Sequence, residues 1–199
     1  MRKLLIFLLL AAAATAVADS KKAEEKLGKA QRALEQGAVP QAEKLTRDAI
    51  KEDPNSVKAH VMLGELLENT KRFSEAAQEY TTALTLDDQQ HSLPDADRLN
   101  ILDQQAVSYA ESGNLPRAKE LYEAAIKKNA DYPLFYYNLA CTYAEMHQLD
   151  PALTNLKKAW SLRDKMPPNT PFPDPRKDSS FSAYVNDPRF QDAVRNMVF

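Results

Sequence analysis

The sequence predicts an all-α protein made of repeated helical hairpins. Residues 136–160 (YYNLACTYAEMHQLDPALTNLKKAW) carry apolar side chains at the three- and four-residue spacing of a helix face, with a break near His147. Asp150 and Pro151 then suit the N-cap and the first position of a second helix. Because a hairpin this short cannot bury both of its faces alone, it requires copies of itself as neighbours.

Small residues at a regular interval mark these copies. From Ala152, a step of 34 residues back reaches Ala118, a step of 42 then reaches Ala76, and a further 34 reaches Ala42. The residues seven positions after these markers are also small: Ala49, Ala83, Ala125 and Ala159. So are those twelve positions before them: Ala30, Gly64, Ala106 and Ala140. Small side chains let helices approach closely, and the residues four positions after the markers fill the space between layers: Thr46, Tyr80, Tyr122 and Leu156.

Composition limits the functional classes. The chain has 199 residues, of which 27% are charged and 44% hydrophobic, which is typical of one globular domain. Its four glycines are scattered, so no glycine-rich phosphate-binding loop is expected. The single cysteine, Cys141, has no intrachain partner, and stability should therefore come from packing rather than from disulfides.

Residues 1–18 have the pattern of a secretory signal peptide. Arg2 and Lys3 precede an apolar run at 4–14, and residues 16–18 (AVA) offer the small side chains at a cleavage site. We expect cleavage after Ala18 and an exported, periplasmic or secreted, protein without a stable membrane anchor; an uncleaved anchor is the alternative. Loss of the two basic residues moves the formal net charge from −2 to −4. The sequence therefore lacks the clustered positive charge that nucleic-acid binding requires.

The repeated pattern resembles the tetratricopeptide repeat, which has a period of 34 residues, small residues at three fixed places and often an aromatic residue at a fourth. The resemblance covers residues 23–166. It implies a right-handed α-solenoid of four helix-turn-helix repeats within residues 19–166, at about 23–56, 57–90, 99–132 and 133–166. The chain should turn back within these repeats at Gly37, Lys71, Gly113 and His147.

Eight additional residues, 91–98, separate the second and third repeats. We expect a loop at 87–91, with Ser92 as the cap of a helix that begins near Pro94. The acidic residues here lack the glycine and the spacing of a calcium loop. A solvated acidic loop with helix-capping Asp residues is favoured over a metal site.

The C-terminal part, 167–199, should cross and close the last repeat. Five prolines within 167–175 predict an extended strap, with a proline-rich ligand for another domain as the alternative. A short turn and a final helix beginning at Asp187-Pro188 should follow. Residues 181–194 (FSAYVNDPRFQDAV) resemble the end-of-group tail of some bacterial tetratricopeptide proteins, in which such a helix caps the array.

No motif indicates catalysis, a cofactor or a metal. The histidines His60, His91 and His147 lie far apart, and no G-x-S-x-G elbow presents a serine. His60 is better explained as a packing residue, and Cys141 as a small packing residue rather than an activated thiolate, which would need a neighbouring cation or a helix N-terminus.

The resemblance places one face of the first helix of each repeat on a concave surface. The candidate partner-binding residues on this surface are Lys58, Val61, Glu65, Glu68, Asn69, Asn100, Asp103, Val107, Glu111, Tyr137, Cys141 and Glu145. Some family members clamp a carboxylate with Lys and Asn at the fifth and ninth positions of a repeat. Here these positions carry other residues: Leu27/Gln31, Val61/Glu65, Asp103/Val107 and Tyr137/Cys141. The acidic residues favour a basic or amphipathic protein segment, or else they only keep the surface soluble.

The predicted function is a non-catalytic interaction scaffold or adaptor that binds a protein or peptide segment. Two alternatives remain open at this stage. One is an enzyme or enzyme subunit of the cell envelope, and the other is a structural array that self-associates.

Overall fold

The computed structural model describes residues 2–197, with side chains from Ala18 onward. The described residues form helices and no strand. The expected signal peptide at 1–18 lies almost entirely where side chains are not described. Among the described residues, no helix is both long and apolar enough to cross a bilayer. The chain divides into two compact units, Met1–Ile101 and Leu102–Phe199.

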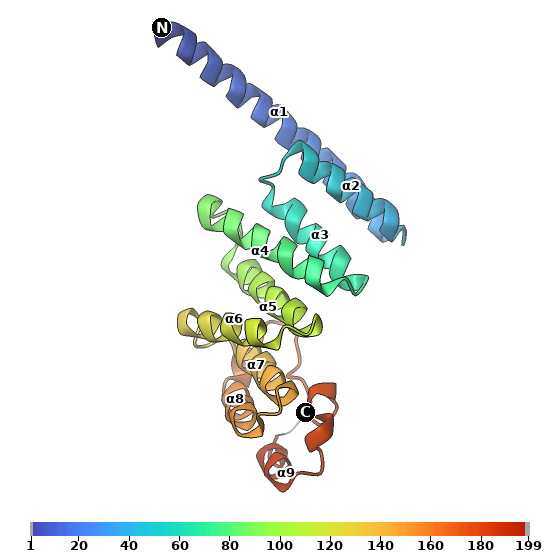
Figure 1. The fold of residues 1–199 in the computed structure, drawn as a ribbon, viewed down its shortest axis with the longest axis vertical. Coiled ribbons are helices and arrows are strands. Elements are labelled where there is room, and N and C mark those ends of the chain that lie inside the picture. The colour runs from blue at the N-terminus through green and yellow to red at the C-terminus, as the bar shows by residue number, and fades with distance from the viewer. Residues whose placement is uncertain (1, 198–199) are drawn as a thin grey trace. The chain divides into compact units, whose positions relative to one another are not determined.

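The first unit contains two helical hairpins. Its helices are α1 (Arg2–Glu35), α2 (Val39–Glu52), α3 (Val57–Asn69) and α4 (Phe73–Gln90), followed by the first part of α5 (Asp95–Glu111). In Figure 1, α1 lies beside α2 and α3 beside α4. The interior is rich in alanine near α1 and α2, and both markers, Ala42 and Ala76, are completely buried. The small residues therefore have the close-packing role that their spacing predicts.

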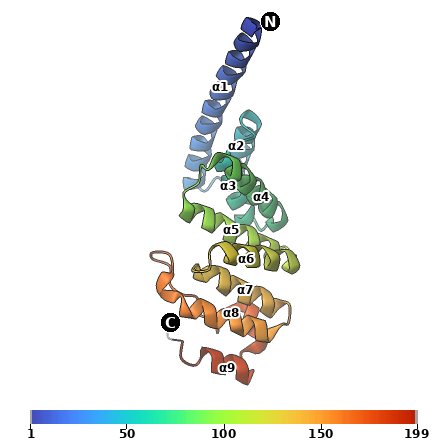
Figure 2. The ribbon, with the colours of Figure 1, turned by 90° about the vertical axis from the view of Figure 1, so that its left-hand side faces the viewer.

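The second unit combines two hairpins with the C-terminal part of the chain. The remainder of α5 is followed by α6 (Leu115–Lys128), α7 (Pro133–Glu145), α8 (Leu149–Ser161), η1 (Arg163–Lys165), η2 (Ser179–Tyr184) and α9 (Pro188–Val194). Figure 2 shows α7, α8 and α9 as successive layers. Phe181 and Phe190 are buried against α7 and α8, with their ring centroids 5.4 Å apart.

The four turns within the hairpins have the same backbone geometry. Positive φ angles occur at Gly37 (73°), Lys71 (59°), Gly113 (85°) and His147 (59°). After each of these residues, the next N–H donates back to a carbonyl near the helix end, as Ala38 does to Ala33 at 2.8 Å. This is the Schellman arrangement, which satisfies the last carbonyls of a helix. The predicted turn positions are confirmed.

Three local predictions at the ends of helices need correction. Helix α8 begins at Leu149 with Gln148 as N-cap, so Asp150 lies in the first turn and is not the cap. Helix α4 continues to Gln90, so most of the loop expected at 87–91 is helical. Asp87 is only 2% exposed, and the hydroxyl of Ser92 donates to its carboxylate instead of capping the next helix.

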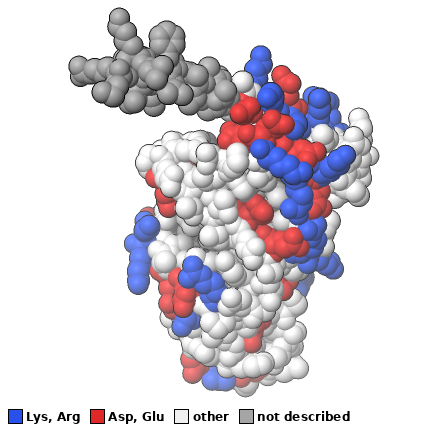
Figure 3. All heavy atoms as spheres, turned by 45° about the horizontal axis from the view of Figure 1, so that its top comes forward, with Lys and Arg blue, Asp and Glu red and all other residues white. Residues whose placement is uncertain are grey.

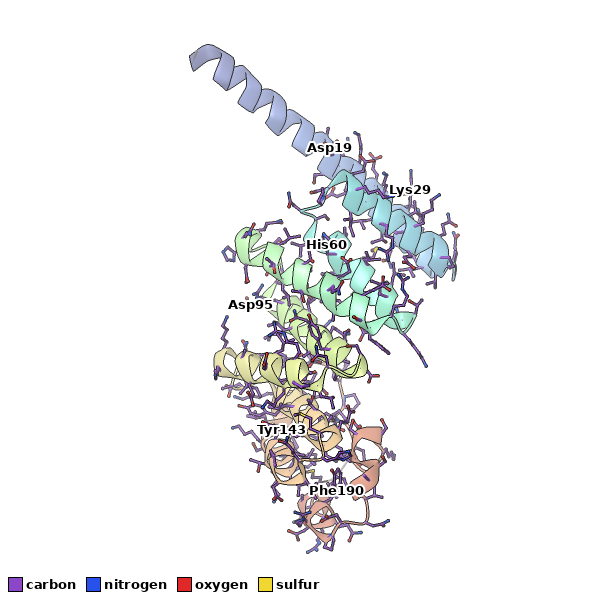
Figure 4. All side chains as sticks on the ribbon, in the orientation of Figure 1. Asp19, Lys29, His60, Asp95, Tyr143 and Phe190 are labelled. Atoms are coloured by element: carbon purple, nitrogen blue, oxygen red, sulfur yellow. The ribbon has the colours of Figure 1, made fainter. Side chains whose placement is uncertain are left out.

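His60, labelled on α3 in Figure 4, is buried and lies between two hydrogen-bond acceptors. Its Nδ1 lies 2.7 Å from Glu79 Oε2 and its Nε2 lies 3.0 Å from the carbonyl oxygen of Pro54. Both contacts can form fully only when the imidazole carries two protons. Burial alone would lower the pKa of His60, but these bonds, together with the charges of Glu79 and Asp53, raise it above its ordinary value of 6.5.

This raised pKa predicts a pH-dependent contribution to stability. The contribution is complete below about pH 6.5 and is lost as the pH rises through the higher pKa of the folded state, because the neutral ring can donate only one of the two bonds. We expect the difference in the free energy of unfolding between the native protein and His60→Gln to become smaller as the pH rises from 5.5 to 8.5. Urea unfolding at each pH measures this difference. Parallel profiles for the two proteins would contradict this protonation state.

Candidate functional site

A cavity of about 440 Å³ in the first unit brings together four of the predicted partner-binding residues. Lys58, Val61 and Glu65 come from α3 at the spacing of one helix face, and Asn100 comes from α5. The remaining lining residues are Val57, Ser92, Leu93, Asp97 and Ile101. The cavity therefore combines an apolar floor with acidic groups and one basic group, which suits an amphipathic side chain better than a small anion.

The two glutamates of α3 have different roles. Glu65 is exposed and its side chain borders the cavity, where partial removal from water and the neighbouring Glu68 raise its pKa. Glu68 is half-buried and accepts a hydrogen bond of 2.9 Å from the hydroxyl of the fully buried Tyr80. Glu65 is thus the better placed of the two to meet a partner, and Glu68 supports the packing of the hairpin. Asn69 is exposed but lies outside the cavity lining.

A second cavity, of about 410 Å³, lies in the second unit. Four predicted residues line it: Val107 and Glu111 from α5, and Cys141 and Glu145 from α7. Its other wall is the segment Lys177 to Ser180, from the C-terminal part of the chain. The sequence predicted a strap across the last repeat but gave no sign of which of its residues would reach this surface.

The remaining two candidate residues are engaged within the second unit. Asp103 Oδ1 accepts a hydrogen bond of 2.8 Å from Asn138 Nδ2. Tyr137 is only 3% exposed, and its hydroxyl donates to Asp178 Oδ2 at 2.8 Å. Tyr137 therefore contacts the chain's own C-terminal part, and it is not on an exposed face as the repeat pattern predicts.

Cys141 is held in a state that does not favour nucleophilic chemistry. Burial, and then the nearby Asp178 carboxylate, raise the pKa of its thiol well above the ordinary value, so the sulfur stays protonated at neutral pH. Its Sγ lies 3.6 Å from Asp178 Oδ2. The arrangement matches a packing residue.

Charge on the described surface is mixed. On the face drawn in Figure 3, Lys and Arg side chains lie interspersed with Asp and Glu. Several charged side chains of the described residues form ion pairs, including Lys26 with Glu52 at 2.6 Å and Arg72 with Glu43 at 2.7 Å. The described part of the chain contains no group of three or more His, Cys, Asp or Glu side chains able to hold a metal ion.

Comparison with known proteins identifies the repeat. Family models of the tetratricopeptide repeat match residues 27–91 and 121–154. A crystal structure of MamA superposes with a TM-score of 0.62 at 20% identity, over 74% of this chain and 82% of that one. The structure of MamA residues 41 to the end from Desulfovibrio magneticus RS-1 gives 0.60 at 18% identity, over 72% and 77%. No curated protein sequence matches the chain.

These structural likenesses, at 20% identity or less, concern the fold. They agree with the helical hairpins, the buried small residues and the four equivalent turns of this chain. The chain contains tetratricopeptide repeats at residues 27–91 and 121–154, and its described residues have the all-α scaffold fold of such repeats.

Proposed function

We propose that this protein is a non-catalytic interaction scaffold that binds a protein segment on the face formed by the first helices of its repeats. The observation that carries the proposal is the cavity beside α3, where Lys58, Val61, Glu65 and Asn100 come together over an apolar floor. Tetratricopeptide and other solenoid proteins use such surfaces for binding. The bound segment carries a basic or amphipathic side chain, whose apolar stem packs on the floor while its charge faces Glu65 and Asp97.

Charge reversal at the cavity should weaken this binding. We expect Glu65→Lys to reduce partner capture by tenfold or more, because the partner's basic group then meets a like charge. The matched control is Glu25→Lys, which makes the same charge change at an exposed position of α1 in the same unit. Affinity capture with each protein, followed by mass spectrometry and titration of the captured partner, measures the effect.

Equal capture by both variants would show that the cavity is not the binding surface. Glu68 and Asp103 are less suitable for this test, because the first accepts from Tyr80 and the second from Asn138. Replacing either by lysine would disturb the packing as well as the charge.

We further propose that the protein acts outside the cytoplasm. The basic start, apolar run and small residues of 1–18 support export with cleavage after Ala18. In a bacterium with two membranes this places the scaffold in the periplasm. Mass spectrometry of the protein recovered from the periplasmic fraction should give a chain that begins at Asp19, and recovery of uncleaved protein in the cytoplasm would contradict the proposal.

A further inference from the structure

The segment from Phe172 to Ser180, called the strap below, covers part of the first-helix face of the last repeat. The ring of Phe172 meets the rings of Tyr137 and Trp160 edge-on, with centroid distances of 5.6 and 5.2 Å. Tyr137 is one of the residues that the repeat pattern assigns to the partner-binding face. The strap therefore occupies a place where a bound partner segment is expected.

Polar contacts hold the second half of the strap. Asp178 Oδ2 accepts from the Tyr137 hydroxyl at 2.8 Å, and Ser180 Oγ donates to Glu145 Oε1 at 2.7 Å. Lys177 borders the same cavity as Glu111 and Glu145. The strap thus supplies an aromatic ring and a carboxylate that contact groups on the face, and a lysine that borders the same cavity as two glutamates.

The strap is attached differently from the residues that follow it. Phe181, Phe190 and Val194 lie in the hydrophobic core of this unit and anchor the end of the described chain. The strap itself has almost no regular secondary structure before Ser179, so side-chain contacts hold it, and its Arg176 and Lys177 are exposed. The strap can therefore leave the face while the anchor stays in place.

We propose that the strap is an intramolecular ligand that blocks the face of the last repeat until a partner segment of the same chemistry displaces it. The partner segment carries an aromatic residue followed, after about five residues, by Lys-Asp-x-Ser. This inference rests on the proposed function, because it assumes that the first-helix face is the binding surface. A tethered segment acts at an effective concentration in the millimolar range, so the strap must be weakened before a free peptide competes well.

Two residues can report this movement, because each is the only one of its type in the chain. Cys141 is the only cysteine, and its sulfur lies 3.6 Å from the Asp178 carboxylate of the strap. Trp160 is the only tryptophan, and its ring packs against Phe172 of the strap. Cys141 is partly exposed with the strap in place, so its rate of thiol labelling should rise when the strap leaves, and tryptophan fluorescence reports whether Phe172 or an equivalent ring is in place.

The test weakens the strap without touching its anchor. Tyr137→Phe combined with Ser180→Ala removes two hydrogen bonds to carboxylates and keeps the Tyr137 ring. We expect the rate of Cys141 labelling by a thiol reagent to rise about tenfold or more, as loss of such bonds implies. The matched control is Tyr136→Phe, whose hydroxyl bonds to the carbonyl of Ala130 and not to the strap. Circular dichroism checks folding, and the single change Ser180→Ala serves if the double variant unfolds.

A synthetic peptide of residues 170–182 (TPFPDPRKDSSFS) then replaces the weakened strap. It should slow Cys141 labelling in the double variant and restore the native Trp160 fluorescence, whereas a scrambled peptide should do neither. Unchanged labelling in the double variant, or an absence of saturable peptide binding, would overturn the proposal. If partner capture still depends on Glu65 in that case, only the strap inference fails; if capture is equally independent of Glu65, the proposed function fails with it.

Discussion

Replacing Gly64 by leucine is expected to destabilise the first unit by roughly 1–3 kcal/mol or more, the usual cost of overpacking a tight core. A Cβ atom added at Gly64 would lie 2.6 Å from Tyr80 Cε1 and 2.8 Å from Tyr80 Cδ1. The Tyr80 ring is completely buried, and its hydroxyl is bonded to Glu68, so it has little freedom to move away. Urea unfolding followed by circular dichroism measures the loss.

Gly28→Ala is the matched control for this prediction. Gly28 lies inside α1, where an added Cβ would meet nothing nearer than Arg32 Nη1 at 3.9 Å. Alanine favours a helix interior over glycine by up to about 1 kcal/mol, so this variant should be slightly stabilised. A Gly64→Leu protein as stable as the native one would show that the contact between α3 and α4 is looser than the structure gives.

Asp87→Ala should have a comparable effect, a loss of about 2–3 kcal/mol, because it removes a buried carboxylate that accepts hydrogen bonds from two backbone N–H groups and an arginine. The Asp87 carboxylate accepts from the backbone N–H groups of Ser92 and Leu93 at 2.9 and 2.8 Å, and from the guanidinium of Arg98. These bonds join the end of α4 to the start of α5. The control is Asp88→Ala, which removes an exposed carboxylate that also pairs with Arg98 and should matter far less.

The same residue predicts acid sensitivity. Burial alone would raise the pKa of Asp87, but the hydrogen bonds from Leu93, Arg98 and Ser92 hold it below its ordinary value of 3.8. The stabilisation is present above about pH 3.8 and is lost as the pH falls through the lower pKa of the folded state. The free energy of unfolding, measured by urea at several pH values between 5 and 2.5, should therefore fall more steeply with pH for the native protein than for Asp87→Ala. Equal slopes for the two proteins would argue against an ionised Asp87.

Features that recur in every repeat could be predicted from the sequence. The buried markers Ala42, Ala76, Ala118 and Ala152 all have zero exposure, since a larger side chain at any of them would push two helices apart. The turn positions followed from the same spacing. Because the same pattern of small residues occurs in four repeats, it can be recognised from a single sequence.

Features that depend on contacts made once in the chain could not be predicted. The burial of Asp87 depends on the backbone of Ser92 and Leu93, which α4 meets only because it runs on to Gln90. The burial of Tyr137 depends on Asp178, which lies 41 residues later. The repeat pattern places Tyr137 on the exposed face, but a contact between residues so far apart leaves no periodic trace in the sequence.

The four turns also show how local strain is distributed. Lys71 and His147 adopt the left-handed conformation, which costs a residue with a Cβ roughly 1–2 kcal/mol, whereas the other two turns use glycine. The hairpins closed by Lys71 and His147 bury many large side chains, while the hairpin closed by Gly37 has an interior composed largely of alanine. Burial of many large side chains can offset the cost of a strained turn residue, whereas glycine at position 37 avoids that cost where the interior is mostly alanine.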